Sequence, residues 1–201
     1  MKKLITLCAA ALALCAYTAS ASAAGLSHTV VKGDTMWKLA VQYRIGTQEM
    51  IDANPQISGP NLIYPGQVLN IPQIDTAISD FEREVVRLVN EARAKNGLKP
   101  LQENWELSRV ARYKSQDMVD NRYFSHTSPI YGTPFRMIKD FGLTYRTAGE
   151  NIAYGQRTPQ AVVNAWMNSS GHRANILNAS YTQIGVGYVA NGHYWTQLFI
   201  G

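Results

Sequence analysis

The most chemically distinctive stretch of this 201-residue chain runs from Ala165 to Leu177. A helix that only fills a core repeats apolar residues along its whole length. Here a polar turn at residues 168–171 interrupts the repeat, and His172 follows directly after it. Such an imidazole is either a local cap or core hydrogen-bond partner, or a group that exchanges protons or binds a ligand. His126 and Glu150 lie upstream, in segments that polar and turn residues also interrupt. All three are therefore candidate functional residues.

Common hydrolase motifs are absent from the sequence, which contains neither His-Glu-x-x-His nor Gly-x-Ser-x-Gly. Ser169 and Ser170 lie near His172 in sequence, but adjacent helical residues do not face each other, so we expect turn or capping roles for them. Asn151 and Asn175 are expected to fix loops around a site, because buried amides need partners. We expect either Trp195 or Gln197 to line the candidate site. The supporting set is Asn151, Ser169, Asn175 and Gln197.

The elements that must position these residues are predicted from residue 79 onward. Ser79 and Glu82 resemble a capping box that opens an amphipathic helix, whose charged residues we interpret as a solvated face. Further signals are an Asn104 cap, a Thr158-Pro159 helix start, alternating strands at Ile184–Val189 and His193–Ile200, and a two-residue Asn191-Gly192 hairpin turn. Helices followed by strands around one core predict an α+β domain.

The segment from His28 to Pro72 predicts a strand, two helices and a second strand. The expected elements are a strand at Thr29–Val31, a helix at Met36–Tyr43 capped by Thr35, a helix opening at Thr47, and a strand at Val68–Ile71. Trp37 shares helical spacing with Ala40, so we expect it in the core.

This first segment resembles a LysM module. The resemblance rests on residues 28–37, on Asn54-Pro55 and on residues 61–67. It implies a small βααβ fold that binds peptidoglycan or chitin-like glycan containing N-acetylglucosamine. The implied shallow groove lies between two loops and involves Gly33, Asp34, Thr35, Met36, Ile63 and Tyr64.

Residues 81–201 resemble the CAP superfamily (cysteine-rich secretory proteins, antigen 5 and pathogenesis-related 1). The matching stretches are residues 123–129, 149–153, 165–177, 184–188 and 194–199. The resemblance implies an α-β-α sandwich with a central cleft, where the family gathers two histidines and two acids. The matching positions are His126, Glu150 and His172, and no carboxylate occurs near Ser169, where the second acid would fall.

Two interpretations of this incomplete set stay open. Two histidines and one glutamate suit zinc or another divalent cation with an open position, which is the candidate cofactor. They also suit a hydrogen-bonded His-Glu pair that holds a ligand without metal. The missing acid argues against a general acid–base scheme that needs two carboxylates.

Residues 1–23 predict a secretory signal, with Lys2 and Lys3 before an apolar run and a small-x-small site before Ala24. The run is too short for a comfortable membrane span, so we expect no transmembrane segment. Both cysteines, Cys8 and Cys15, lie in the signal, which leaves the exported chain without disulfides. Loss of two lysines lowers the formal charge from +5 to +3, and no basic block predicts nucleic-acid binding.

The predicted organisation is a signal at 1–23, a LysM module at 26–73, a linker at 74–79 and a CAP domain at 80–201. We expect a monomeric, secreted protein located in the cell wall or outside the cell. Two functions remain possible from the sequence. The one we favour is a wall-anchored binding protein that catalyses no reaction, and the other is a metal-assisted hydrolase of peptidoglycan peptides or envelope proteins.

Overall fold

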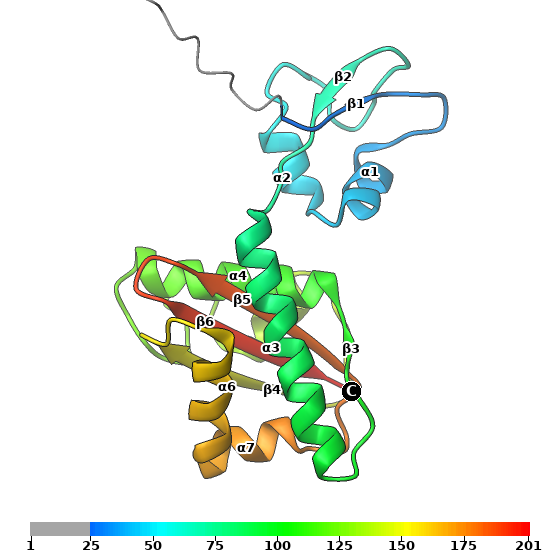
Figure 1. Cartoon of the computed structure of the whole chain (residues 1–201). Helices are drawn as coiled ribbons and strands as arrows, with labels where there is room; N and C mark the ends of the chain where they lie inside the picture. The colour runs from blue at the N-terminus through cyan, green and yellow to red at the C-terminus, as the bar shows by residue number, and fades with distance from the viewer. Residues whose placement is uncertain (1–24) are drawn as a thin grey trace, which may run out of the picture.

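The computed structural model describes residues 25–201, so the predicted signal segment lies outside the described residues. The chain forms a small N-terminal module and a larger C-terminal domain (Figure 1). The module contains β1 (Ser27–Thr29), α1 (Met36–Tyr43), α2 (Thr47–Asp52) and β2 (Val68–Asn70). The predicted βααβ order is confirmed.

Local hydrogen bonds explain most of the module. The Thr35 hydroxyl caps α1 by accepting from the Lys38 N–H at 3.1 Å. The buried Asn54 side chain ties the end of α2 to β2, donating to the Asn70 carbonyl at 2.8 Å and accepting from its N–H at 2.7 Å. The first strand ends at Thr29 rather than Val31, because the Val31 N–H already bonds the Asp34 carboxylate at 2.8 Å in the following turn.

The expectation that Trp37 lies in the core is wrong, since 63% of it is exposed. The buried face of α1 is made by Met36, Leu39 and Ala40. Trp37 instead shares the outer face with Val41, four residues on, which is also exposed.

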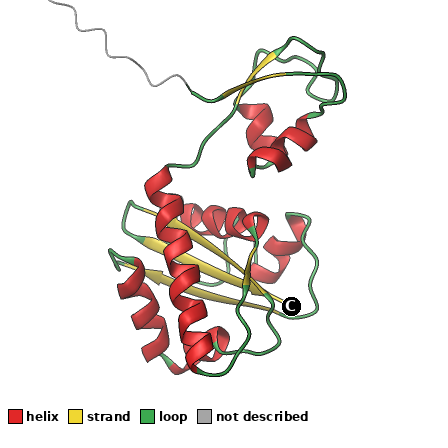
Figure 2. Ribbon diagram, turned by 45° about the vertical axis from the view of Figure 1, so that its right-hand side comes forward, coloured by secondary structure: helices red, strands yellow, loops and turns green. Residues whose placement is uncertain are grey.

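The C-terminal domain is a three-layer α-β-α sandwich (Figure 2). Its elements are α3 (Thr76–Lys95), β3 (Gln102–Glu103), α4 (Trp105–Asp120), α5 (Pro134–Asp140), β4 (Ala148–Tyr154), α6 (Pro159–Asn168), α7 (Ser170–Ile176), β5 (Gln183–Val189) and β6 (Tyr194–Ile200). The sheet order is β3-β5-β6-β4, with β3 parallel to β5 and the other pairs antiparallel. Helices α3, α6 and α7 lie on one face, and α4 and α5 on the other.

Two glycines let α4 approach the sheet closely. A Cβ on Gly185 would overlap the Leu107 backbone, and one on Gly187 would overlap the Ala111 backbone. The Ser115 hydroxyl completes this contact by donating to the Gly187 carbonyl at 3.1 Å. Helix α4 thereby becomes a rigid support for the loop that follows it.

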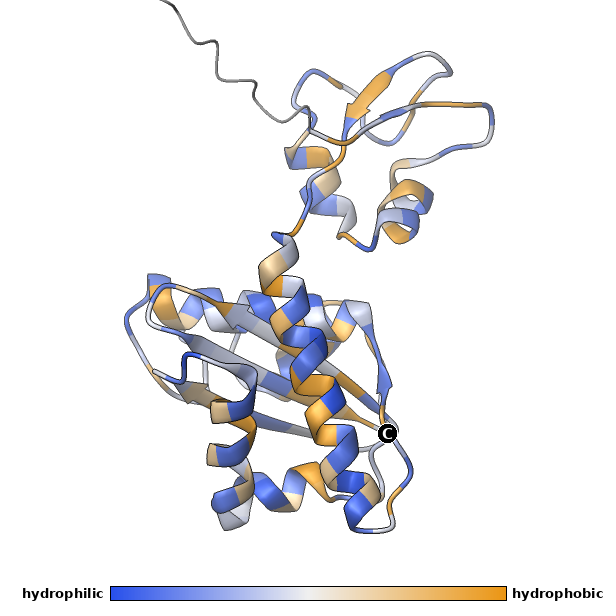
Figure 3. Ribbon diagram, viewed as in Figure 1, coloured by the Kyte–Doolittle hydropathy of each residue, from blue (hydrophilic) through white to orange (hydrophobic). Residues whose placement is uncertain are grey.

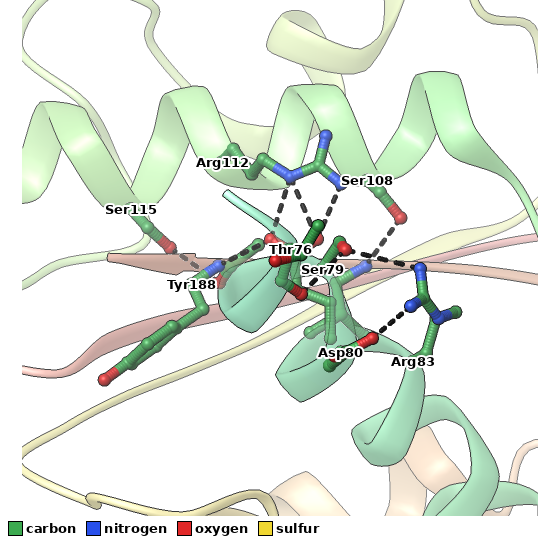
Figure 4. Close-up of polar contacts among 11 residues, drawn as sticks. Thr76, Ser79, Asp80, Arg83, Ser108, Arg112, Ser115 and Tyr188 are labelled. Atoms are coloured by element: carbon green, nitrogen blue, oxygen red, sulfur yellow. Dashed lines mark hydrogen bonds and ion pairs between the residues drawn. The ribbon is translucent and has the colours of Figure 1, made fainter. Parts of the chain in front are cut away.

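Helix α3 begins earlier than predicted, inside the expected 74–79 linker. Asp75 is its N-cap and accepts from the Ala77 N–H at 2.8 Å, so Ser79 lies within the helix and makes no capping box. Glu82 is buried, where it accepts from the Arg112 guanidinium at 2.6 Å and from the Tyr188 N–H at 3.1 Å. Figure 4 shows Arg112 and Tyr188 close to Thr76 and Ser79 at the start of α3. Burial raises the pKa of Glu82.

The charged residues of α3 are therefore not only a solvated face. Figure 3 shows polar and apolar residues alternating along this helix, but Glu82 and Arg93 lie on its buried side. The Arg93 guanidinium donates to the carbonyls of Ile176 at 2.8 Å and Asn178 at 2.9 Å. This buried cation fixes the segment that leaves α7.

The β5–β6 connection has four residues rather than the predicted two. Val189 pairs with Tyr194, which leaves residues 190–193 in the turn. Gly192 has φ 77° and His193 has φ 54°, so the left-handed residues follow Asn191 instead of including it. His193 contacts the Tyr188 hydroxyl at 2.7 Å.

One ion pair links the two parts of the chain. The Arg109 guanidinium of α4 donates to both Glu49 carboxylate oxygens of α2, at 2.5 and 2.9 Å. Arg109 also lies over the Tyr113 and Phe141 rings, 5.5 and 5.0 Å from their centroids. Among residues 25–201, no helix is both long and apolar enough to span a bilayer.

Candidate functional site

The candidate site, which corresponds to the cleft that the resemblance implies, is built across β4, an edge strand of the sheet. The Glu150 carboxylate is buried and faces the α4 side, where its Oε1 lies 2.6 Å from Nδ1 of His126. His126 belongs to the loop after α4, and its side chain is 55% exposed. The hydrogen bond therefore fixes an accessible imidazole through one nitrogen and leaves Nε2 available.

His172 reaches the same edge from α7, on the other face of the sheet. Asn151, which follows Glu150 on β4, donates to the His172 carbonyl at 3.1 Å. Asn175 donates to the Glu150 carbonyl at 3.1 Å and to the Asn151 amide oxygen at 2.9 Å. Side chains alternate faces along a strand, so these two asparagines hold α7 while Glu150 faces the opposite loop.

Gln197 joins this network from β6. Its amide oxygen accepts from Asn151 at 2.9 Å, and the side chain is fully buried. Ser169 sits at the α6–α7 junction, where its N–H bonds the Trp166 carbonyl at 3.1 Å. Its hydroxyl makes no hydrogen bond among the described residues.

The two imidazoles have opposite pKa shifts. The hydrogen bond that His126 donates to the Glu150 carboxylate raises the pKa of His126. Burial, together with the charge of His126, lowers the pKa of His172. His126 therefore holds its proton to a higher pH than His172 does.

The N-terminal loops proposed to bind glycan lie side by side. Val30 accepts from the Gly66 N–H at 2.9 Å and donates to the Gln67 carbonyl at 2.8 Å, which joins the chain before the 33–36 loop to the turn after Tyr64. Tyr64 is 58% exposed.

The other predicted glycan residues differ in what they can present. Met36 and Ile63 are buried, so only their backbone groups are available. Gly33 has φ 97°, a left-handed conformation suited to glycine. The Asp34 carboxylate is bonded to the His28 ring at 2.9 Å and to the Val31 N–H. Thr35 is exposed, and its hydroxyl caps α1.

The family model described as the cysteine-rich secretory protein family, CAP, matches residues 86–199, which is more than half of the chain. The chain belongs to the CAP family. The LysM domain model matches residues 28–72, the N-terminal module.

Relatives of the CAP domain occur in several bacteria. The uncharacterized protein YkwD of Bacillus subtilis is 61% identical over 126 residues, which cover 63% of this chain and 49% of YkwD. A solved extracellular protein of Bacillus anthracis that contains an SCP domain is 33% identical, with a TM-score of 0.60, over 68% of this chain and 47% of that one. An outer surface protein of Borrelia burgdorferi is 26% identical, with a TM-score of 0.56, over 64% of this chain and 96% of that one. The chain thus spans only about half the length of YkwD.

No ready-made metal cluster is found in the part of the chain that the structure describes. Within residues 25–201, no three histidine, cysteine, aspartate or glutamate side chains are arranged to hold one ion. His126 already uses Nδ1 to bond Glu150. Nε2 of His126 stays available as a ligand atom, so zinc binding by His126, Glu150 and His172 stays a prediction.

Lys114 is a site residue that the sequence interpretation missed. It is 1% exposed, and its ammonium donates to the carbonyls of Ser125 at 2.8 Å and His126 at 3.1 Å and to the Tyr123 hydroxyl at 2.9 Å. Its place on the apolar face of α4, four residues after Val110, was the available signal. Burial lowers the pKa of Lys114.

Three buried side-chain polar atoms of the CAP domain have no partner among the described residues. They are Oε2 of Glu150, Oε1 of Gln156 and Nε2 of Gln197. Buried polar atoms are rarely left unpaired, so each is a place for a water molecule or a ligand group. Glu150 Oε2 belongs to the buried carboxylate that holds His126 and is not exposed at the surface.

Proposed function

We propose that this is an exported, cell-wall-associated protein whose LysM module binds peptidoglycan or chitin-type glycan and whose CAP domain presents a ligand-binding cleft. The observation that carries the glycan assignment is the pairing of the two loops, with exposed Leu62 and Tyr64 beside accessible backbone at Gly33. Apolar side chains pack on sugar faces, while backbone amides and carbonyls bond acetamido groups.

The cleft is proposed to bind rather than to hydrolyse. When His126 is protonated, its exposed ring presents an Nε2–H donor, while the buried Glu150 carboxylate holds the ring through Nδ1. A ligand with a carbonyl acceptor, such as a peptide or acetamido group, complements this donor. The second carboxylate that acid–base hydrolysis needs is missing from this pair.

The metal-assisted hydrolase remains the alternative, and zinc titration tests it. Calorimetry on the full exported chain is expected to show no tight site, because the described donors form no three-ligand cluster. Tight binding that His172→Ala abolishes without unfolding the protein would favour the hydrolase instead.

The glycan assignment is tested with the full exported chain and insoluble peptidoglycan or chitin. Tyr64→Ala should release most of the bound protein, because it removes an exposed ring beside the loops. Leu26→Ala is the matched control, since Leu26 is also exposed but lies at the other end of the β1–β2 pair. Equal loss in both variants, or no loss in Tyr64→Ala, would contradict the assignment.

A further inference from the structure

A second hollow lies on the CAP domain, away from the LysM loops. It forms where the end of β4, the β5–β6 turn and the loop after α4 meet, and it has a volume of about 520 Å³. Its lining includes Arg122, Phe124, Tyr154, Asn191, Gly192 and Tyr194.

Three aromatic rings form one side of the hollow. Phe124 meets Tyr154 edge to face, with centroids 4.8 Å apart, and Tyr154 lies nearly parallel to Tyr194 at 5.7 Å. Phe124 is 45% exposed and Tyr154 56% exposed. Rings that pack on each other yet remain this open offer apolar surface to a ligand rather than to the core.

Polar donors stand beside the rings. Arg122 and Asn191 are exposed, and neither side chain makes a hydrogen bond within the described residues. The walls are tied together, because the Gly155 N–H at the end of β4 bonds the Gly192 and His193 carbonyls, both at 3.1 Å. The hollow therefore keeps its shape without a ligand.

We propose that this hollow is a second carbohydrate site, which takes a sugar ring of the same glycan that the LysM module binds. The inference rests on the proposed function for the class of glycan. A pyranose ring matches the lining, since its apolar face packs on aromatic rings while its hydroxyls accept from guanidinium and amide donors. An acyl chain would leave Arg122 and Asn191 without a role, and the hollow is open rather than enclosed.

The position of the hollow suits a polymer. Phe124 is two residues before His126, and Tyr154 is four residues after Glu150 on the same edge strand, about 13 Å along it. A glycan strand seated on the rings would therefore carry its amide-bearing substituents toward the cleft. Two weak sites on one chain also raise the apparent affinity for a polymer, because the second contact becomes intramolecular.

Nuclear magnetic resonance on the full exported chain tests this site, with a soluble N-acetylglucosamine tetramer as the probe. The ring signals of Phe124 and Tyr194 should shift saturably, and should still do so in Tyr64→Ala. Tyr154→Ala should weaken this site about tenfold, as expected for loss of one stacking ring. Tyr154→Phe should restore the affinity, and Phe135→Ala, an exposed ring outside the hollow, should leave it unchanged.

The outcomes separate the two proposals. If Tyr64 signals shift but those of Phe124 and Tyr194 do not, the second site is wrong and the LysM assignment stands. If only the hollow responds, the LysM assignment is wrong and the second site stands. If neither responds, both are wrong. If a sugar-free tetrapeptide shifts the hollow signals and the tetramer does not, the hollow is a peptide site and this inference is overturned.

Discussion

The LysM module and the CAP domain hold their candidate binding loops with different kinds of interaction. In the module, short-range bonds such as those of Thr35 and Asn54 shape loops over a small apolar core. In the CAP domain, buried cations hold loops instead. Arg93 lies beneath the exit of α7, 83 residues away in sequence, and Lys114 lies beneath the His126 loop, 12 residues away.

The difference lies in the number of donors that each group supplies and, for Arg93, also in distance along the chain. Asn54 reaches partners no more than 16 residues away, whereas Arg93 bonds Asn178, 85 residues away. A neutral amide can fix a neighbouring turn, but a long cation with several donors can hold several carbonyls of a remote segment at once. The CAP cleft should therefore be more sensitive to loss of a single buried charge than the LysM loops are.

The largest effect is expected from Lys114→Met. It leaves two loop carbonyls and the Tyr123 hydroxyl without their donor, so the CAP domain should lose about 3 kcal/mol of unfolding free energy. Hydrogen exchange resolved by residue measures this loss, and protection in α1 and α2 should not change. A loss below about 1 kcal/mol would show that the buried ammonium does not hold the loop.

Asn54→Ala is the matching change in the LysM module. It removes both bonds to Asn70 and should cost about 2 kcal/mol there, because buried partners are left unpaired. The same exchange measurement should show lower protection in α2 and β2, with the cleft unchanged. If the cleft also loosens, the module and the domain are not the separate units that the comparison assumes.

Arg109→Ala tests the contact between the LysM module and the CAP domain. The pair with Glu49 is partly exposed, so its loss should cost about 1 kcal/mol or less. The clearer result is expected in ¹⁵N relaxation, where the two parts should tumble more independently. Unchanged tumbling would mean that the peptide connection alone sets the arrangement.

The smallest effect on stability concerns the cleft histidines. The raised pKa of His126 means that its protonated ring stabilises the fold fully below about pH 6.5, and this contribution disappears as the pH rises through the raised value. The lowered pKa of His172 acts in the opposite sense: its contribution is present above about pH 6.5 and is lost as the pH falls through the lowered value. Imidazole NMR titrations should show His126 above His172.

Glu150→Gln is the control for this titration. It removes the negative partner, so the pKa of His126 should fall, while its hydrogen-bond geometry is largely kept. Equal pKa values for the two histidines in the parent protein would contradict the predicted coupling.

Much of the secondary structure was determined locally by the sequence. The Thr35, Asn104 and Thr158 caps start their helices as predicted, because capping depends on one side chain and the next turn. The domain order and the α+β class also followed from the sequence, because apolar periodicity and family motifs can be recognised without knowledge of the packing.

The tertiary structure decided what the sequence pattern could not. Glu82 had the spacing of a capping box but became a buried partner of Arg112, and Trp37 had core spacing but lies outside. The sequence located His126 and Glu150, but only the fold brought them within 2.6 Å and placed the charge of Lys114 beneath them. Local patterns fix backbone conformation over a few residues, whereas the partner of a buried charge depends on which remote segments the sheet brings together.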